Sequence, residues 1–210
     1  EAILDALRPD TLLVSVMHAN NETGVCQPLA EIAKLLKDSE AYFHVDAAQG
    51  YGKDLEPLRS ERVDLISVSG HKIYGPLGVG ALIARRRGFK RAPLKPIMHG
   101  GGQERGLRPG TLPVPLIIGL GVAAEAALKD NEARKARCLA MRGEALAALE
   151  PLGIRMHAKE EHTLPHVLNF CVPGLDSEAI MVALRGVAAV SNGSACTSQS
   201  YTPRHVLEAM

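Results

Sequence analysis

The sequence is poor in aromatic residues and lacks long apolar runs. Phe, Tyr and Trp make up 3% of its 210 residues, and tryptophan is missing altogether. No window approaches the roughly 18 consecutive apolar residues that a membrane-spanning helix needs, so we expect no membrane association. A strong net charge is also missing, because 24 Lys and Arg nearly balance 23 Asp and Glu. This balance argues against a broad basic surface for direct nucleic-acid binding.

Metal-binding cysteine patterns and an initiator methionine are missing as well. The chain has four cysteines, at Cys26, Cys138, Cys171 and Cys196, without a CxxC pair or the spacing of a zinc site. We therefore expect no metal centre, and a reduced, cytoplasmic setting fits these isolated thiols best. The first residue, Glu1, falls inside a helix-like segment. We expect a piece of a longer protein, whose targeting signals would lie outside it.

The residues that are present favour an α/β fold. Hydrophobic residues make up 46% of the chain and the mean hydropathy is +0.02, which is enough apolar material for a sizeable core. Strands alternate with a helix in the first part of the chain, and this alternation indicates a mostly parallel sheet. The expected elements are strands at Thr11–Met17, Ala41–Val45, Val63–Val68 and Val79–Ala84, and a helix at Pro28–Lys37.

The second part of the chain has a different pattern. A glycine-rich loop at 99–111 is followed by a helical stretch at 115–149. Short strands are expected at Ile154–Met156, His166–Val172 and Val187–Ser191, around a helix at Ser177–Leu184. We expect two domains, with residues 1–119 in the α/β domain and residues 120–210 in a smaller α+β domain.

Lys72 is the first candidate catalytic residue. It follows a strand in the turn Ser69-Gly70-His71-Lys72, between two apolar runs. In parallel sheets ligands gather at the carboxyl ends of strands, where this turn lies. A lysine held among apolar strands can lose its proton and form a Schiff base with a carbonyl group.

A second strand end carries Asp46 and, three positions later, Gln49. Alone, Asp46 is better explained as a turn or cap residue. Beside a Schiff-base lysine, however, a carboxylate could keep the pyridine nitrogen of pyridoxal phosphate protonated. Gln49 and Asn21 are amides that could reach the ring hydroxyl of that cofactor, although either could instead bond loop backbone.

Ser69 and His71, with the backbone N–H groups around Gly70, could bind the cofactor phosphate. Taken alone, His71 is better explained as a structural histidine. Cys196 lies in the small-residue loop SNGSACTS, where an isolated thiol is usually inert. A cofactor-binding lysine elsewhere in the chain supplies a reason for a mobile nucleophile there.

Five motifs carry a resemblance to a known family. They are, in chain order, HANNETGV, HVDAAQ, SGHKIYGPLGVGAL, HGGGQERGLRPGT and SNGSACTS. In this order they resemble the cysteine desulfurases with a GSACTS loop, which are fold-type I pyridoxal phosphate enzymes of the class-V aminotransferase family. The resemblance implies that residues 1–119 are part of the large, cofactor-binding domain.

The resemblance also implies roles for single residues. Lys72 would carry the cofactor, and Asp46 would contact its pyridine nitrogen. Cys196 would attack the sulfur of L-cysteine and leave L-alanine and an enzyme persulfide. The remaining contacts would be Asn21 and Gln49 to the ring hydroxyl, Ser69 and His71 to the phosphate, and Thr111 to the phosphate in the partner subunit of a homodimer.

The persulfide sulfur would pass to an acceptor protein in iron–sulfur cluster assembly, tRNA thiolation or DNA phosphorothioation. Two alternatives stay open, another fold-type I lyase or aminotransferase, and a non-catalytic remnant that dimerises or docks a sulfur acceptor. Family members also have an upstream ring-stacking histidine and a downstream arginine for the substrate carboxylate, which this segment does not supply. We therefore expect the 210-residue segment alone to be inactive.

Overall fold

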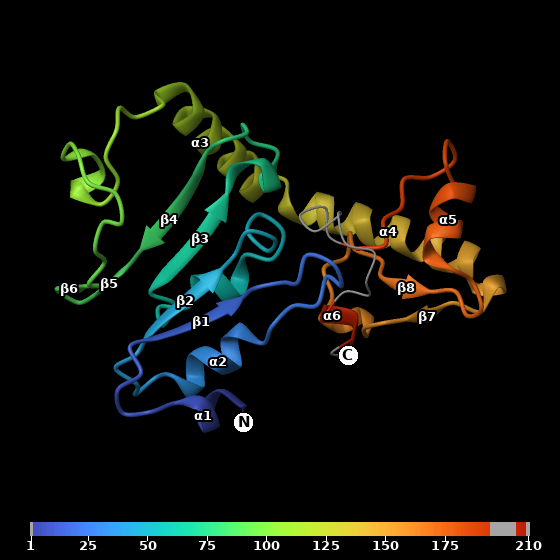
Figure 1. Cartoon of the computed structure of the whole chain (residues 1–210), viewed down its shortest axis with the longest axis horizontal. Helices are drawn as coiled ribbons and strands as arrows, with labels where there is room; N and C mark the ends of the chain where they lie inside the picture. The colour runs from blue at the N-terminus through green and yellow to red at the C-terminus, as the bar shows by residue number, and fades with distance from the viewer. Residues whose placement is uncertain (1, 194–204, 209–210) are drawn as a thin grey trace. The chain divides into compact units, whose positions relative to one another are not determined.

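The structure is a computed structural model that describes residues 2–193 and 205–208 (Figure 1). The chain divides into two compact units. Unit 1 contains Glu1–His18 and Gln27–Glu132, and unit 2 contains Ala19–Cys26 and Ala133–Met210. The expected domain limit between residues 119 and 120 stays a prediction. Within the described ranges, no helix is long and apolar enough to cross a membrane.

Unit 1 is built on a four-stranded sheet in the order β1-β2-β3-β4 (Figure 1). Strands β1, β2 and β3 are parallel, and β4 runs antiparallel to β3. The predicted mostly parallel α/β sheet is therefore confirmed. The strands are β1 Leu13–Met17, β2 Tyr42–Asp46, β3 Leu65–Ser69 and β4 Gly80–Ala84.

The other elements of unit 1 are short, apart from one helix. Helix α3 covers Val114–Lys129. The remaining pieces are the helices α1 Ala2–Ala6 and α2 Leu29–Leu35, the strands β5 Arg86–Arg87 and β6 Lys90–Arg91, and the 3₁₀ turns η1 Glu56–Arg59, η2 Gly70–Ile73 and η3 Gln103–Gly106.

The two faces of the sheet differ in chemistry, because successive side chains of a strand point to opposite faces. One face packs against α2 and forms the core, which includes Phe43 and Val45 of β2 at 0% exposure. Each such side chain stabilises the fold by about 1.5–3 kcal/mol through burial. The opposite face carries His44 and Asp46 of β2, both partly exposed. This second face is therefore the polar face of the sheet.

Unit 2 holds the rest of the chain. Its elements are α4 Asn131–Leu149, which begins at the end of unit 1, η4 Glu150–Leu152, β7 Arg155–Met156, η5 Glu160–His162, β8 Phe170–Cys171, α5 Ser177–Ala183 and α6 His205–Glu208. Strands β7 and β8 pair antiparallel. The helical stretch expected at 115–149 is broken at Asp130, where α3 ends.

The strand expected at Val187–Ser191 is wrong. In the part of unit 2 that the structure describes, these residues form a turn and irregular backbone. Gly186 has a φ of +83°, which ends the preceding helical turn, and the Val187 side chain is 82% exposed. A β-branched run needs a neighbouring strand to become a strand itself, and none pairs with it among the described residues.

A buried carboxylate, Asp64, joins the sheet to the arginines around it. Its side chain is 2% exposed and accepts hydrogen bonds from Arg62 Nη1 at 2.8 Å and Arg87 Nε at 2.6 Å. The backbone N–H of Phe43 donates to the same carboxylate at 2.6 Å. Burial by itself would raise the pKa of Asp64, but the hydrogen bonds from Arg87 and Phe43 and the two arginine charges lower it below its ordinary value of 3.8.

We expect Asp64→Asn to lower the free energy of unfolding by about 3 kcal/mol, because it leaves two partly buried guanidinium groups without their counter-charge. The pKa of Asp64 is depressed in the folded state, so its stabilisation is full above pH 3.8 and is lost as the pH falls through the folded pKa. Urea unfolding of the complete protein at several pH values measures both effects. The matched control is Asp10→Asn, since Asp10 pairs with Arg8 at an exposed site. Equal stability of the two variants would contradict this prediction.

Candidate active site

Lys72 lies in η2, directly after β3, and the backbone around it closes tightly. The N–H of Gly70 donates to the carbonyl of Val79 at 2.9 Å, and the N–H of Gly75 donates to the carbonyl of Gly70 at 2.9 Å. A Cβ on Gly70 would lie 2.8 Å from the Val79 oxygen, so a larger residue would push the two segments apart. The glycine therefore allows β3 to turn directly into the lysine segment.

The buried side chain of Ile73 anchors this turn in the core. Its side chain is 3% exposed, and a Cβ on Gly52 would lie 2.9 Å from it and 3.0 Å from Ala127 of α3. Gly52 has a φ of +76°, a conformation that favours glycine, so the turn at Gly52 and helix α3 both press against Ile73. With its neighbour held in the core, Lys72 is itself only partly exposed.

Lys53 is a second lysine at this place, and none of the sequence motifs singles it out. Its Nζ donates to the carbonyl of Gln49 at 2.9 Å and to the carbonyl of Lys72 at 3.2 Å. Burial, and then the charge of Lys72, lower the pKa of Lys53 from its ordinary value. Lys53 thus ties the segment after β2 to the segment after β3.

Asp46 is the last residue of β2 and lies opposite Ser67 in the parallel register with β3. Its Oδ1 atom accepts hydrogen bonds from the N–H of Ala48 at 3.0 Å and from Ser67 Oγ at 3.4 Å. Among the described residues, no hydrogen bond is formed by its Oδ2 atom. One oxygen of Asp46 is therefore held in place, and the other is available to a ligand.

Ser69 and His71 also come together. The Ser69 Oγ and His71 Nδ1 atoms are 3.0 Å apart, and His71 is exposed. A hydroxyl, an imidazole and the backbone N–H groups of a turn can together bind an anion. Gln49 is partly buried, and its carbonyl accepts the bond from Lys53. These residues belong to the same unit as Asp46 and Lys72.

The remaining predicted site residues are Asn21, Thr111 and Cys196. Asn21 is exposed and belongs to unit 2, where the neighbouring Asn20 Oδ1 accepts bonds from the N–H groups of Glu22 and Thr23 at 2.9 Å each. Thr111, the last residue of the glycine-rich loop at 99–111, is exposed and belongs to unit 1. Cys196 lies outside the described residues.

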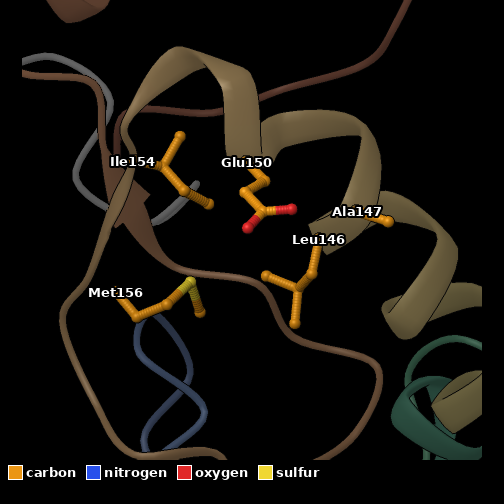
Figure 2. Close-up of a pocket in the computed structure, with 5 residues that line it drawn as sticks. All are labelled: Leu146, Ala147, Glu150, Ile154 and Met156. Atoms are coloured by element: carbon orange, nitrogen blue, oxygen red, sulfur yellow. The ribbon is translucent and has the colours of Figure 1, made fainter.

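A pocket in unit 2 contains none of the predicted residues (Figure 2). Its volume is about 360 Å³, and it is lined by Leu146, Ala147, Glu150, Ile154 and Met156. Figure 2 shows the single carboxylate of Glu150 among apolar side chains. Glu150 is the one ionisable group of this lining, so the residues predicted to carry the chemistry are those on the polar face of unit 1.

The fold and site define a class of protein. Lys72 follows β3 and Asp46 ends the neighbouring parallel strand β2, with Ser69 and His71 paired in the turn after β3. The Asp46 carboxylate, with one oxygen hydrogen-bonded, and the Lys72 amine lie at adjacent strand ends. They fit a cofactor that combines an aldehyde, a basic ring nitrogen and a phosphate, as pyridoxal phosphate does. The fold and site are therefore those of an α/β chain with residues suited to a carbonyl cofactor.

The comparisons with known proteins are more specific. The pattern of the family described as aminotransferase class-V matches residues 1–210. Over 207 residues the chain is 48% identical to the cysteine desulfurase IscS of Anaeromyxobacter dehalogenans. That alignment covers 98% of this chain and 50% of the relative. It is 44% identical to the mitochondrial cysteine desulfurase of Saccharomyces cerevisiae, with 98% and 41% covered. The chain therefore belongs to the aminotransferase class-V family, whose members depend on pyridoxal phosphate.

Solved structures agree with this assignment. The crystal structure of DndA from Streptomyces lividans matches with a TM-score of 0.85 and 47% identity, over 99% of this chain and 59% of that one. A NifS-like protein matches with a TM-score of 0.84 and 36% identity, over 99% and 54%. The chain spans about half the length of the curated relatives it matches.

Proposed function

We propose that the protein containing this chain is a pyridoxal phosphate-dependent cysteine desulfurase. It removes sulfur from L-cysteine, releases L-alanine and keeps the sulfur as a persulfide on Cys196. The observation that carries the proposal is the placement of Asp46 and Lys72 at adjacent strand ends, in a chain 48% identical to a cysteine desulfurase.

The residues of unit 1 divide the work of holding the cofactor. Lys72 Nζ would hold the aldehyde carbon, and Asp46, whose Oδ1 is bonded by Ala48 and Ser67, would offer Oδ2 to the ring nitrogen. Ser69 and His71 would bind the phosphate, together with Thr111 from a partner subunit. Gln49 and Asn21 would bond the ring hydroxyl. When bound, the cofactor acts as an electron sink for the substrate Cα.

Two residues then act on the substrate. Lys72 Nζ would take the proton from the substrate Cα and later return a proton to the product. Cys196 acts as a thiolate and attacks the substrate sulfur, so that an S–S bond forms while the Cβ–S bond breaks. A thiol on a loop can meet the substrate and afterwards present its persulfide to an acceptor.

The partners of the complete protein follow from the same proposal. They are L-cysteine, a second copy of the chain, and a sulfur-acceptor protein of iron–sulfur cluster assembly, tRNA thiolation or DNA phosphorothioation. In the homodimer, Thr111 of each copy would reach the cofactor phosphate of the other copy. The protein acts in the cytoplasm. The two curated relatives are named as cysteine desulfurases, which supports L-cysteine as the substrate.

The test uses the complete protein with added pyridoxal phosphate and L-cysteine. We expect a new absorbance band from bound cofactor, and sulfide and L-alanine in equal amounts when a reducing thiol is present. An aminotransferase would instead need a 2-oxo acid and release no sulfide. A non-catalytic remnant would give neither product, and either result would overturn the proposal.

A further inference from the structure

A chain of four hydrogen-bonded side chains crosses the polar face of the sheet. Ser15 Oγ of β1 lies 2.7 Å from His44 Nδ1 of β2, and His44 Nε2 lies 3.1 Å from Ser67 Oγ of β3. Ser67 Oγ in turn lies 3.4 Å from Asp46 Oδ1. The register explains the order, because Ser15 is opposite His44 and Asp46 is opposite Ser67.

The donors and acceptors of this chain can be arranged in one way when His44 is neutral. An ionised carboxylate only accepts, so the Ser67 hydroxyl donates to Asp46. Ser67 has a single hydroxyl proton and therefore accepts from the Nε2–H of His44. The Nδ1 atom of His44 then carries no proton and accepts from the hydroxyl of Ser15. All three bonds point toward Asp46.

We propose that Ser67, backed by His44 and Ser15, is a positioning residue that orients Asp46 toward the cofactor ring nitrogen. The proposal rests on the proposed function, because it assigns Asp46 to that nitrogen. Ser67 and the N–H of Ala48 both bond Oδ1, so the carboxylate cannot rotate freely and Oδ2 keeps its direction. His44 fixes the Ser67 hydroxyl, which alone could turn to other acceptors.

A comparison of the two faces of the sheet shows that the four hydrogen-bonded side chains are not needed to hold the strands together. The core face of β2 is filled by Phe43 and Val45, so the strands are already held together by apolar contacts. On the polar face, Asp46 is the one carboxylate among the described residues that these hydrogen-bonded side chains contact. A carboxylate that stabilises a ring N–H⁺ must be oriented toward it, and supporting hydrogen bonds usually fix that orientation.

The first test compares Ser67→Ala with Ser67→Thr in the complete protein. We expect Ser67→Ala to bind pyridoxal phosphate about tenfold more weakly, the loss typical of one hydrogen bond to a charged group, and to shift the absorbance band that reports ring-nitrogen protonation. Ser67→Thr keeps a hydroxyl and should restore both. The matched control is Tyr42→Phe, which removes a hydroxyl bonded to the Arg91 carbonyl on the same face of β2.

The second test needs no cofactor. Nitrogen NMR of the cofactor-free complete protein should show His44 protonated at Nε2 and bare at Nδ1, and Ser67→Ala should change the Nε2 signal. A proton on Nδ1 alone, or an unchanged band and affinity in Ser67→Ala, would overturn the positioning role. If the unmodified protein binds no pyridoxal phosphate, the proposed function fails, while the NMR result still decides whether the chain of bonds exists.

Discussion

Lys72→Ala is expected to abolish covalent cofactor attachment and to lower desulfurase activity by at least about 10²–10⁴-fold, the contribution of one positioned proton-transfer group. The amine of Lys72 serves both as the attachment point and as the base for the substrate Cα. Lys72→Arg should fail equally, although it keeps a positive charge, because a guanidinium stays protonated and is a poor nucleophile. Borohydride reduction followed by mass spectrometry measures the attachment directly.

The fold should survive this change, so a loss of activity would report on chemistry. The contact that Lys72 makes to Lys53 uses its backbone carbonyl, which alanine also has. The buried neighbour Ile73 stays in place as well. The control is Lys90→Ala, an exposed lysine of β6 that should leave the cofactor mass unchanged. Cofactor mass retained on the Lys72→Ala protein would exclude Lys72 as the attachment site.

Much of the sheet could be predicted because each strand has a recognisable local pattern of apolar residues. Apolar β-branched runs gave β1 to β4, and the strand ends then gave Asp46 and Lys72. His44, Ser67 and Lys53 could not be selected in this way. The roles of His44 and Ser67 depend on the register between neighbouring strands. The role of Lys53 depends on the turn after β2, which brings its Nζ to the carbonyls of Gln49 and Lys72. A single sequence does not contain that register.

The arginines after β4 show the same limit. The run Arg85-Arg86-Arg87 looks like a solvated turn when only the local charge is considered. In the structure, Arg87 instead pairs with the buried Asp64, more than twenty positions earlier in the chain, and its Cζ lies 4.9 Å from the Tyr42 ring centre. A charge run is solvated only when no buried counter-charge meets it, and that depends on the tertiary structure.

Cys196→Ser is expected to stop sulfide release by at least about 10³-fold while cofactor binding and its absorbance stay unchanged. A serine hydroxyl is almost fully protonated at neutral pH and forms no stable bond to sulfur, so no persulfide can be stored. The thiol contributes nothing to cofactor attachment, which depends on Lys72. Sulfide and alanine release, the absorbance band and the mass of a trapped persulfide measure the separate steps.

The matched control is Cys171→Ser, because Cys171 is an exposed free thiol on β8 of the same unit. It should keep full activity, which separates the loss of a particular nucleophile from the loss of any thiol. An aminotransferase has no use for a loop thiol, so full activity of the Cys196→Ser protein would favour another fold-type I enzyme. Loss of the absorbance band would instead assign Cys196 to cofactor binding. Only the combination of retained cofactor and lost sulfide release identifies Cys196 as the residue that makes this lysine-dependent site a desulfurase.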